Sequence, residues 1–198
     1  ILYAIPPIIG IIFQILFYGI SLILNSVAIS LLMVFLNIQD HSINTDHLTG
    51  VSNRKKLDAY LKEKISLSTR EKSFSTILID INDFKYINDT YGHNMGDNAL
   101  ETIANLLKNC LRTGDFVARY GGDEFCVVLD ISNARDLEAL AGRIMNCVDM
   151  YNKSGSNLYK LDISMGYAVY DRKQHESAQE FLNQMDMLMY ENKQAYKN

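Results

Sequence analysis

The stretch 116–129 reads FVARYGGDEFCVVL, and it predicts two β-strands joined by a tight turn. Its two arms are rich in β-branched and aromatic side chains, which favour strands. Gly121 and Gly122 lie between the arms, where glycine permits the backbone geometry of a hairpin turn. We therefore predict a β-hairpin whose tip carries two adjacent carboxylates, those of Asp123 and Glu124.

The segments on either side of this hairpin alternate between helical and strand patterns. Residues 75–81 (STILIDI) predict a buried strand, and residues 161–170 predict another. Residues 46–50 predict a capped turn that leads into a helix. The order helix, strand, helix, hairpin, helix, strand, helix predicts an α+β fold, in which helices pack on a sheet. The three helices after the first are expected at residues 98–111, 137–151 and 178–196.

The N-terminal part of the chain is apolar and uncharged as far as residue 39. Residues 20–37 (ISLILNSVAISLLMVFLN) are long enough to cross about 30 Å of hydrocarbon as a helix. We therefore predict a transmembrane segment within residues 1–38, with a linker at 39–45. A buried core helix is the alternative. The sequence leaves open whether residues 8–18 end a second spanning helix or lie at the membrane interface.

The charges after the apolar part predict how it is oriented. Arg54, Lys55 and Lys56 follow the predicted span and no base precedes it, so the positive-inside rule predicts a cytoplasmic C-terminal part. A signal peptide is disfavoured because a basic leading region is absent. Since the sequence begins at Ile1, we expect it to be the C-terminal part of a longer protein.

Length, charge and cysteine content narrow the class of protein. The chain has 198 residues, enough for one ordinary domain with a short extension. Its net charge of −4 argues against broad nucleic-acid binding, which needs a basic face. Cys110, Cys126 and Cys147 are an odd set without a CxxC spacing, so we predict reduced cysteines that serve in packing.

Carboxylates occur at two places that the fold can bring together. Asp80 lies at the C-terminal end of the strand at 75–81, and Asp123 and Glu124 lie at the hairpin tip. Such a group suits Mg²⁺, and two ions can activate an attacking oxygen and stabilise a leaving one. The two glycines would let a phosphate or base approach the backbone. Acids at hairpin turns are also often merely solvated, so these residues alone leave both interpretations open.

From Asp46 onwards the chain resembles the diguanylate cyclase family, whose name-giving motif is GGDEF. Residues 121–125 carry that motif, and other family blocks follow in the same order and spacing. These blocks are Asp46–Arg54 (DHLTGVSNR, similar to DxLTGxxNR), Asp80–Lys85 (DINDFK), Asn88–His93 (NDTYGH) with Gly96-Asp97, and Ser164–Ala168 (SMGYA, similar to SxGxA).

The resemblance implies a fold, an activity and a location. The fold is a central, mainly antiparallel sheet wrapped by helices over residues 46–198, similar to a polymerase palm, here preceded by a transmembrane helix. The activity is the condensation of two GTP into cyclic di-GMP and two pyrophosphates, by a homodimer with Mg²⁺ or Mn²⁺. The location is the bacterial inner membrane, in contact with lipid, with the catalytic domain in the cytoplasm. No nucleic-acid partner is implied.

The family motifs also assign roles to individual residues. Asp80, the carbonyl of Ile81 and Asp123 would hold the metals, and Glu124 would bind metal or activate the 3′-hydroxyl. Asn88 and Asp97 would read the guanine edge, because a carboxylate accepts the N1 and N2 protons of guanine. The groups expected around the substrate are Phe84, Lys85, Gly121, Gly122, Lys193 and Lys197. Backbone amides near Asp83 and Phe84, with Lys193, would hold the terminal phosphates.

Residues 112–115 (RTGD) match the RxxD inhibitory site of the family. The resemblance implies that Arg112 and Asp115 bind the product and limit its synthesis. The alternative is an ordinary surface turn after a helix, with the arginine favouring the helix C-terminus and the aspartate solvated.

Three departures and one alternative function accompany the resemblance. Asn82 stands where many members have aspartate, Tyr196 where they have glycine, and Lys197 where they have arginine. A lysine keeps the charge but loses bidentate geometry, which would weaken GTP binding. The alternative is a catalytically inactive module that acts as a c-di-GMP or GTP receptor in membrane signalling. The presence of Asp80 and the complete GGDE sequence favours the enzyme.

Overall fold

The computed structural model describes residues 4–17, 22–69, 73–155, 158–174 and 177–197. The chain divides into two compact units, Ile1–Asn44 and Thr45–Asn198.

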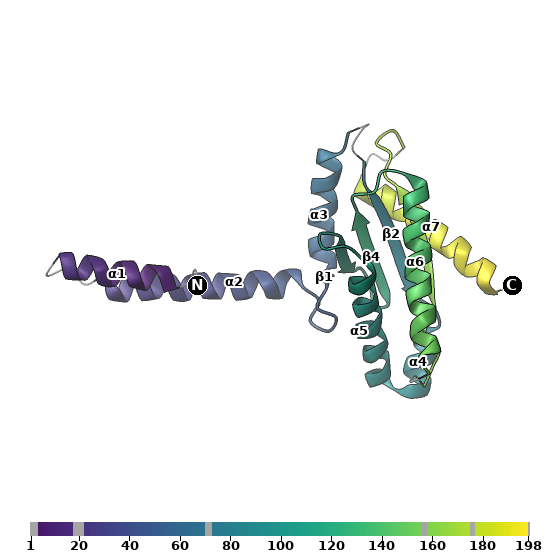
Figure 1. The fold of residues 1–198 in the computed structure, drawn as a ribbon, viewed down its shortest axis with the longest axis horizontal. Coiled ribbons are helices and arrows are strands. Elements are labelled where there is room, and N and C mark those ends of the chain that lie inside the picture. Colours follow the sequence, from purple (N-terminus) through teal and green to yellow (C-terminus); the bar gives the residue numbers. More distant parts are fainter. Residues whose placement is uncertain (1–3, 18–21, 70–72, 156–157, 175–176, 198) are drawn as a thin grey trace. The chain divides into compact units, whose positions relative to one another are not determined.

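The N-terminal unit is a pair of helices, α1 (Ile5–Leu16) and α2 (Ile23–Asn44), which run alongside each other (Figure 1). Gly10 of α1 is buried against Ser26 of α2. A Cβ atom at Gly10 would overlap the Ser26 hydroxyl oxygen and lie 2.9 Å from the Ser26 Cβ. The close approach of the helices therefore depends on the missing side chain of Gly10.

The predicted transmembrane helix is not supported by this unit. Within the described residues, no helix combines the length and the apolar character needed to cross a bilayer. Helix α1 has 12 residues, which at 1.5 Å per residue gives about 18 Å of the roughly 30 Å required. Helix α2 contains Asn25, Ser26 and Ser30, and its C-terminal half runs into a polar sequence. Residues 18–21, partly within the predicted span, lie outside the described residues.

The second unit is built on a five-stranded sheet with the strand order β1-β3-β4-β2-β5. Strands β1 and β3 pair in parallel and the other neighbours are antiparallel, so the sheet is mixed and mainly antiparallel, as predicted. The strands are β1 (Ser52–Asn53), β2 (Ser75–Ile81), β3 (Phe116–Arg119), β4 (Glu124–Leu129) and β5 (Ile163–Val169). The helices are α3 (Arg54–Leu67), α4 (Phe84–Tyr91), α5 (His93–Cys110), α6 (Ala134–Lys153) and α7 (Ala178–Lys197). The predicted α+β fold is confirmed.

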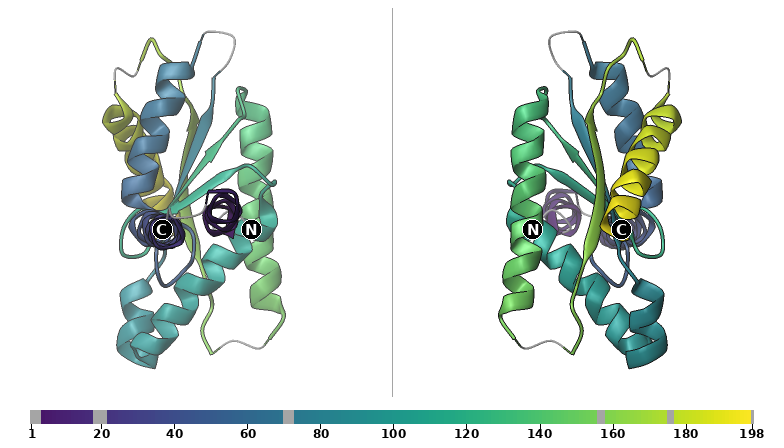
Figure 2. Two further views of the ribbon diagram at one scale, coloured as in Figure 1. Left: turned by 90° about the vertical axis from the view of Figure 1, so that its left-hand side faces the viewer. Right: turned by 90° about the vertical axis from the view of Figure 1, so that its right-hand side faces the viewer.

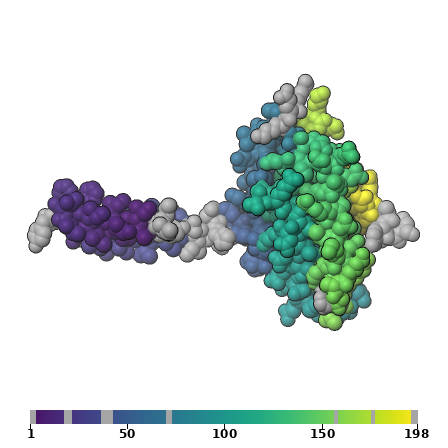
Figure 3. All heavy atoms as spheres, viewed as in Figure 1, coloured from purple at the N-terminus to yellow at the C-terminus, as the bar shows by residue number. Residues whose placement is uncertain are grey.

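The helices cover both faces of the sheet, α5 and α6 on one and α3 and α7 on the other (Figure 2). The alternation of side chains along β2 explains the two layers, because successive residues of a strand point to opposite faces. Ile77 and Ile79 are buried in the core beneath α5 and α6, whereas Leu78 is buried beneath α3 and α7. Figure 3 shows α5 in teal and α6 in green, lying side by side on the visible face.

Helix α7 lies directly on β5 at Gly166. A Cβ atom there would overlap the carbonyl oxygen of Met185 and lie 2.6 Å from the amide nitrogen of Met189. Since these are backbone atoms, they cannot rotate away as a side chain would.

Replacing Gly166 with alanine should therefore lower the free energy of unfolding by about 3 kcal/mol. Gly142→Ala is the matched control, because nothing lies within 4 Å of a Cβ at this helical position and alanine favours a helix over glycine by about 1 kcal/mol. Urea unfolding of both variants measures the difference. Equal midpoints would show that α7 does not rest on β5 in this way.

Candidate active site at the end of β2

The predicted metal ligands come together at the end of the β2–β4 pair. The register places Asp80 of β2 opposite Glu124 of β4. One residue further, the amide of Ile81 donates a hydrogen bond to the carbonyl oxygen of Asp123 at 3.2 Å. The strand end and the hairpin tip therefore lie side by side, as the sequence predicted.

Lys193 approaches these acids from α7. Its Nζ lies 2.5 Å from Oδ1 of Asp80, and the two side chains are 29% and 13% exposed. The neighbouring Asn192 donates a hydrogen bond from Nδ2 to the Met165 carbonyl at 2.7 Å, which holds this turn of α7 on β5. The contact at Gly166 and this hydrogen bond together fix the position of the lysine.

Burial and neighbouring carboxylates raise the pKa of Asp80 and of Glu124. Burial raises the pKa of Asp80, Asp123 and Asp186 raise it further, and the ion pair with Lys193 opposes them. Burial likewise raises the pKa of Glu124, and the nearby Asp80 and Asp123 reinforce this effect. Negative charge therefore accumulates here, and a cation would stabilise the ionised form.

The described residues contain no group of three His, Cys, Asp or Glu side chains gathered closely enough to form a metal cage. The Glu124 carboxylate lies against Gly121, where a Cβ would overlap its Oε2 atom. Mg²⁺, however, is usually held by one or two carboxylates together with substrate phosphates rather than by an all-protein cage. The paired strand ends, their carboxylates and their accumulated negative charge fit such an ion.

Two arginines, Arg119 and Arg54, contact residues of the hairpin, and the sequence did not predict these contacts. Arg119 donates from Nη2 to the Gly122 carbonyl at 2.7 Å and from Nη1 to Asp46 Oδ1 at 3.3 Å. Burial opposes ionisation of Asp46, but hydrogen bonds from Thr49 and the charge of Arg119 lower its pKa. Arg54 lies 4.5 Å from the centre of the Tyr120 ring.

These contacts give the opening motif at 46–54 a structural role. Both of its ends, Asp46 and Arg54, hold the arm that leads to the glycine turn. The motif was visible in the sequence, but its contacts across more than 60 residues were not.

The predicted guanine-reading residues lie at the junction of α4 and α5. Asn88 packs against the backbone of Gly96, where a Cβ would overlap the amide oxygen and lie 2.9 Å from Cγ of Asn88. Asp97 is the next residue along α5 and is exposed. The side-chain amide of Asn88 therefore lies beside Gly96, the residue directly before Asp97.

The N-terminus of α4 follows β2 after two residues. Asp83 is the N-cap residue of α4, and its backbone adopts the left-handed conformation, at φ 53° and ψ 31°. Its side chain makes no capping hydrogen bond. The first amide groups of a helix lack helical partners, and they attract phosphate. Phe84 and Lys85 supply such amides. Lys197 lies in the last turn of α7, and its side chain is outside the described part of the chain.

The RTGD turn borders a cavity of about 630 Å³. The carboxylate of Asp115 accepts a hydrogen bond from the Arg112 amide at 2.8 Å, so the turn is closed on itself. The opposite wall is α6, which contributes Arg143. Sequence reasoning missed Arg143, because only the packing of α6 beside α5 brings it to this turn.

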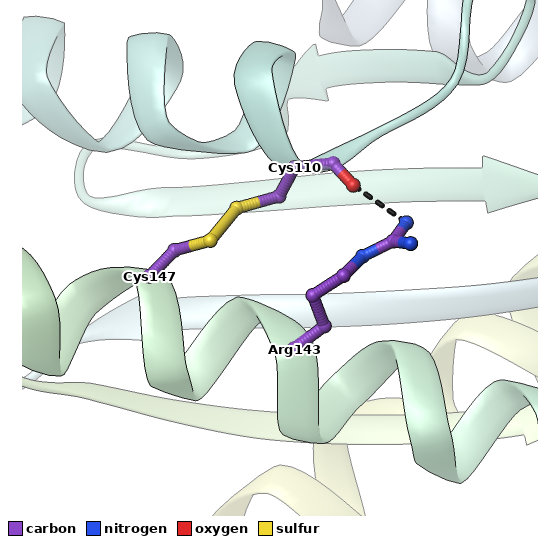
Figure 4. Close-up of a disulfide and its surroundings, with 3 residues drawn as sticks. All are labelled: Cys110, Arg143 and Cys147. Atoms are coloured by element: carbon purple, nitrogen blue, oxygen red, sulfur yellow. Dashed lines mark hydrogen bonds between the residues drawn. A yellow bond between two sulfur atoms is a disulfide. The ribbon is translucent and has the colours of Figure 1, made fainter.

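The prediction of reduced cysteines is wrong for two of the three. Cys110 at the end of α5 and Cys147 on α6 form a disulfide, with Cα atoms 7.1 Å apart (Figure 4). The pair is 37 residues apart in sequence, so spacing alone could not reveal it. Cys126 is free and fully buried, burial raises the pKa of its thiol, and it packs beneath α3 and α7 as predicted.

Comparison with known proteins identifies the class. Residues 43–198 match the family described as diguanylate cyclase, GGDEF domain, and the chain belongs to this family. It is 39% identical over 137 residues to diguanylate cyclase A of Treponema denticola, an alignment covering 67% of this chain and 36% of the relative. It is 32% identical over 168 residues to diguanylate cyclase DosC of Escherichia coli K12, covering 83% of this chain and 36% of DosC.

A solved structure shows the same fold. The coiled coil and GGDEF domain of DgcB from Caulobacter crescentus, in complex with c-di-GMP, superposes with a TM-score of 0.79 at 24% identity. The match covers 86% of this chain and 91% of that one. The chain spans about a third of the length of the two curated relatives, since each alignment covers 36% of the relative.

Proposed function

We propose that this chain is the catalytic part of a diguanylate cyclase, which condenses two GTP into cyclic di-GMP and releases two pyrophosphates. The observation that carries the proposal is the strand register that sets Asp80 opposite Glu124, with Asp123 at the adjoining turn. The relatives named as diguanylate cyclases support the same activity.

The reaction needs two copies of the domain, because each site is expected to hold one GTP. In a twofold-symmetric dimer, the 3′-oxygen of each nucleotide attacks the α-phosphorus of the other, and the bond to pyrophosphate breaks. Glu124 is suited to accept the 3′-hydroxyl proton, because its raised pKa brings it closer to the pH at which a general base is effective. The domain otherwise contributes orientation and charge.

The remaining residues position the nucleotide. Lys193 would exchange its contact with Asp80 for the nucleotide phosphates, together with the first amides of α4. Asp80, Asp123 and the Ile81 carbonyl would hold Mg²⁺ or Mn²⁺, which supplies positive charge beside the phosphates.

A pyrophosphate assay with GTP and Mg²⁺ tests the proposal. Release of pyrophosphate together with cyclic di-GMP supports the cyclase. Binding of GTP or cyclic di-GMP without turnover would instead support the alternative, an inactive receptor module.

We also propose that the cavity beside α6 binds the product and limits its synthesis. Arginine can donate a planar fork to a phosphate or to the O6 and N7 atoms of guanine, and an aspartate can accept from guanine N1 and N2. Arg112, Asp115 and Arg143 bring both kinds of group to one cavity of sufficient size.

Replacing Arg112 with alanine should raise the product concentration that halves the rate by about tenfold, because one charged hydrogen-bonding partner is lost. Progress curves measure this effect, and the variant should accumulate product beyond the level at which the parent protein stalls. Arg135→Ala is the control, because Arg135 is an exposed arginine of α6 outside the lining of the cavity. Curves that level off at the same product concentration, with GTP in excess, would contradict the proposal.

A further inference from the structure

The disulfide lies at the edge of the proposed product site. Cys110 is the last residue of α5 and lies two residues before Arg112, in the turn that also carries Asp115. Cys147 lies one helical turn after Arg143 on α6. Figure 4 shows Arg143 beside the bond, donating from Nη2 to the carbonyl oxygen of Cys110 at 2.6 Å. The same two segments therefore carry the cysteines and the walls of the cavity.

The three cysteines differ in their access to solvent and in their position in the fold. Cys110 is 7% exposed and Cys147 is half-buried, so a small thiol reagent can reach the pair through Cys147. Cys126 is 0% exposed and packs on the other face of the sheet. Thiol–disulfide exchange should therefore occur at Cys147 and Cys110 and spare Cys126.

We propose that Cys110 and Cys147 form a redox site that sets the affinity of the domain for its product. The inference rests on the proposed product site. In the oxidised form the bond ties the end of α5 to α6, which holds the RTGD turn and Arg143 on facing walls. A pre-organised site loses less free energy on binding, so the oxidised domain binds product more tightly. Reduction removes the link and weakens inhibition.

A low-molecular-weight disulfide such as oxidised glutathione can oxidise the two cysteine thiols to the protein disulfide. The thiolate of Cys147 attacks one sulfur of the reagent, which releases one glutathione thiolate and leaves a mixed disulfide. The thiolate of Cys110 then attacks the Cys147 sulfur, forms the protein disulfide and releases the second glutathione. Two electrons pass to the reagent, and the two protons from the cysteine thiols end on the two glutathione thiols. An excess of reduced thiol reverses both steps.

The test compares one preparation of the 198-residue chain in two redox states. After treatment with oxidised glutathione or with dithiothreitol, alkylation and mass measurement count the free thiols. Binding of cyclic di-GMP is measured by calorimetry, and its inhibition of pyrophosphate release is measured in parallel. We expect the oxidised form to bind product about fivefold more tightly, a coupling typical of linked sites.

Two variants serve as matched controls. Cys147→Ser should remove the difference between the two treatments and leave the initial rate without product unchanged. Cys126→Ala, which removes the buried thiol on the other face, should keep the difference.

The outcomes separate this inference from the proposed function. A protein disulfide that forms without any change in product affinity overturns the redox site, and so does a pair that stays reduced in oxidised glutathione. Product binding that is insensitive to both redox state and Arg112→Ala overturns the product site itself. Pyrophosphate release reports on the cyclase activity independently of either result.

Discussion

Replacing Asp80 with alanine should lower the rate of pyrophosphate release from GTP by about 10³-fold, and Asp123→Ala should do the same. Each change removes a carboxylate from the place where β2 ends and the glycine turn enters β4, and where the proposed metal ion would lie beside the phosphates. The structure adds that Asp80 also pairs with Lys193. The variant therefore frees the lysine while it removes the carboxylate.

Loss of activity through unfolding can be separated from loss of the ligand. Burial raises the pKa of Asp80, so its ionised form is less favourable in the folded domain than in the unfolded chain. Its removal should therefore leave the thermal midpoint close to that of the parent protein. Asp186→Asn is the matched control, because Asp186 is an exposed acid of α7 whose charge acts on the same site. We expect it to change turnover less than fivefold. More than a tenth of parent turnover in Asp80→Ala would exclude the role assigned to that residue.

The sequence predicts best where local pattern and long-range register agree. Strand β2 was predicted at 75–81 and forms there, because this short run is rich in β-branched residues and buries almost all of its side chains. The hairpin forms within 116–129 as predicted, but Glu124, which was expected at its tip, is the first residue of β4, and β3 ends at Arg119.

The missed elements have little local signal of their own. Helix α4 has eight residues and buries only Ile87 among them. Strand β1 has two residues and exists through its parallel pairing with β3. Neither could be recognised from periodicity, which needs several repeats to stand out.

At the candidate site, the sequence predicted which residues take part but not most of the contacts between them. The acids were predicted together, because one ends a strand and the others follow a glycine turn. The ion pair of Lys193 with Asp80, the position of Arg143 and the disulfide all join segments far apart in sequence. Each depends on how a helix packs on the sheet or on another helix.

ATP should be used about 10⁴-fold less efficiently than GTP, compared as kcat/KM for pyrophosphate release. A site built to pair specific polar groups rejects an analogue that leaves them unpaired. Asp97 would accept protons from guanine N1 and N2, whereas adenine presents an acceptor at N1. Asn88 lies against Gly96, so its side-chain amide is held near the N-terminal end of α5, close to Asp97.

Replacing Asp97 with asparagine should lower kcat/KM for GTP by at least about 10²-fold and reduce the preference for GTP over ATP, because the acceptor for guanine N1 and N2 is lost. Glu101→Gln is the control, since Glu101 is an exposed carboxylate one turn further along α5 and should leave both values unchanged. Comparable use of the two nucleotides by the parent protein would show that Asn88 and Asp97 do not select the base.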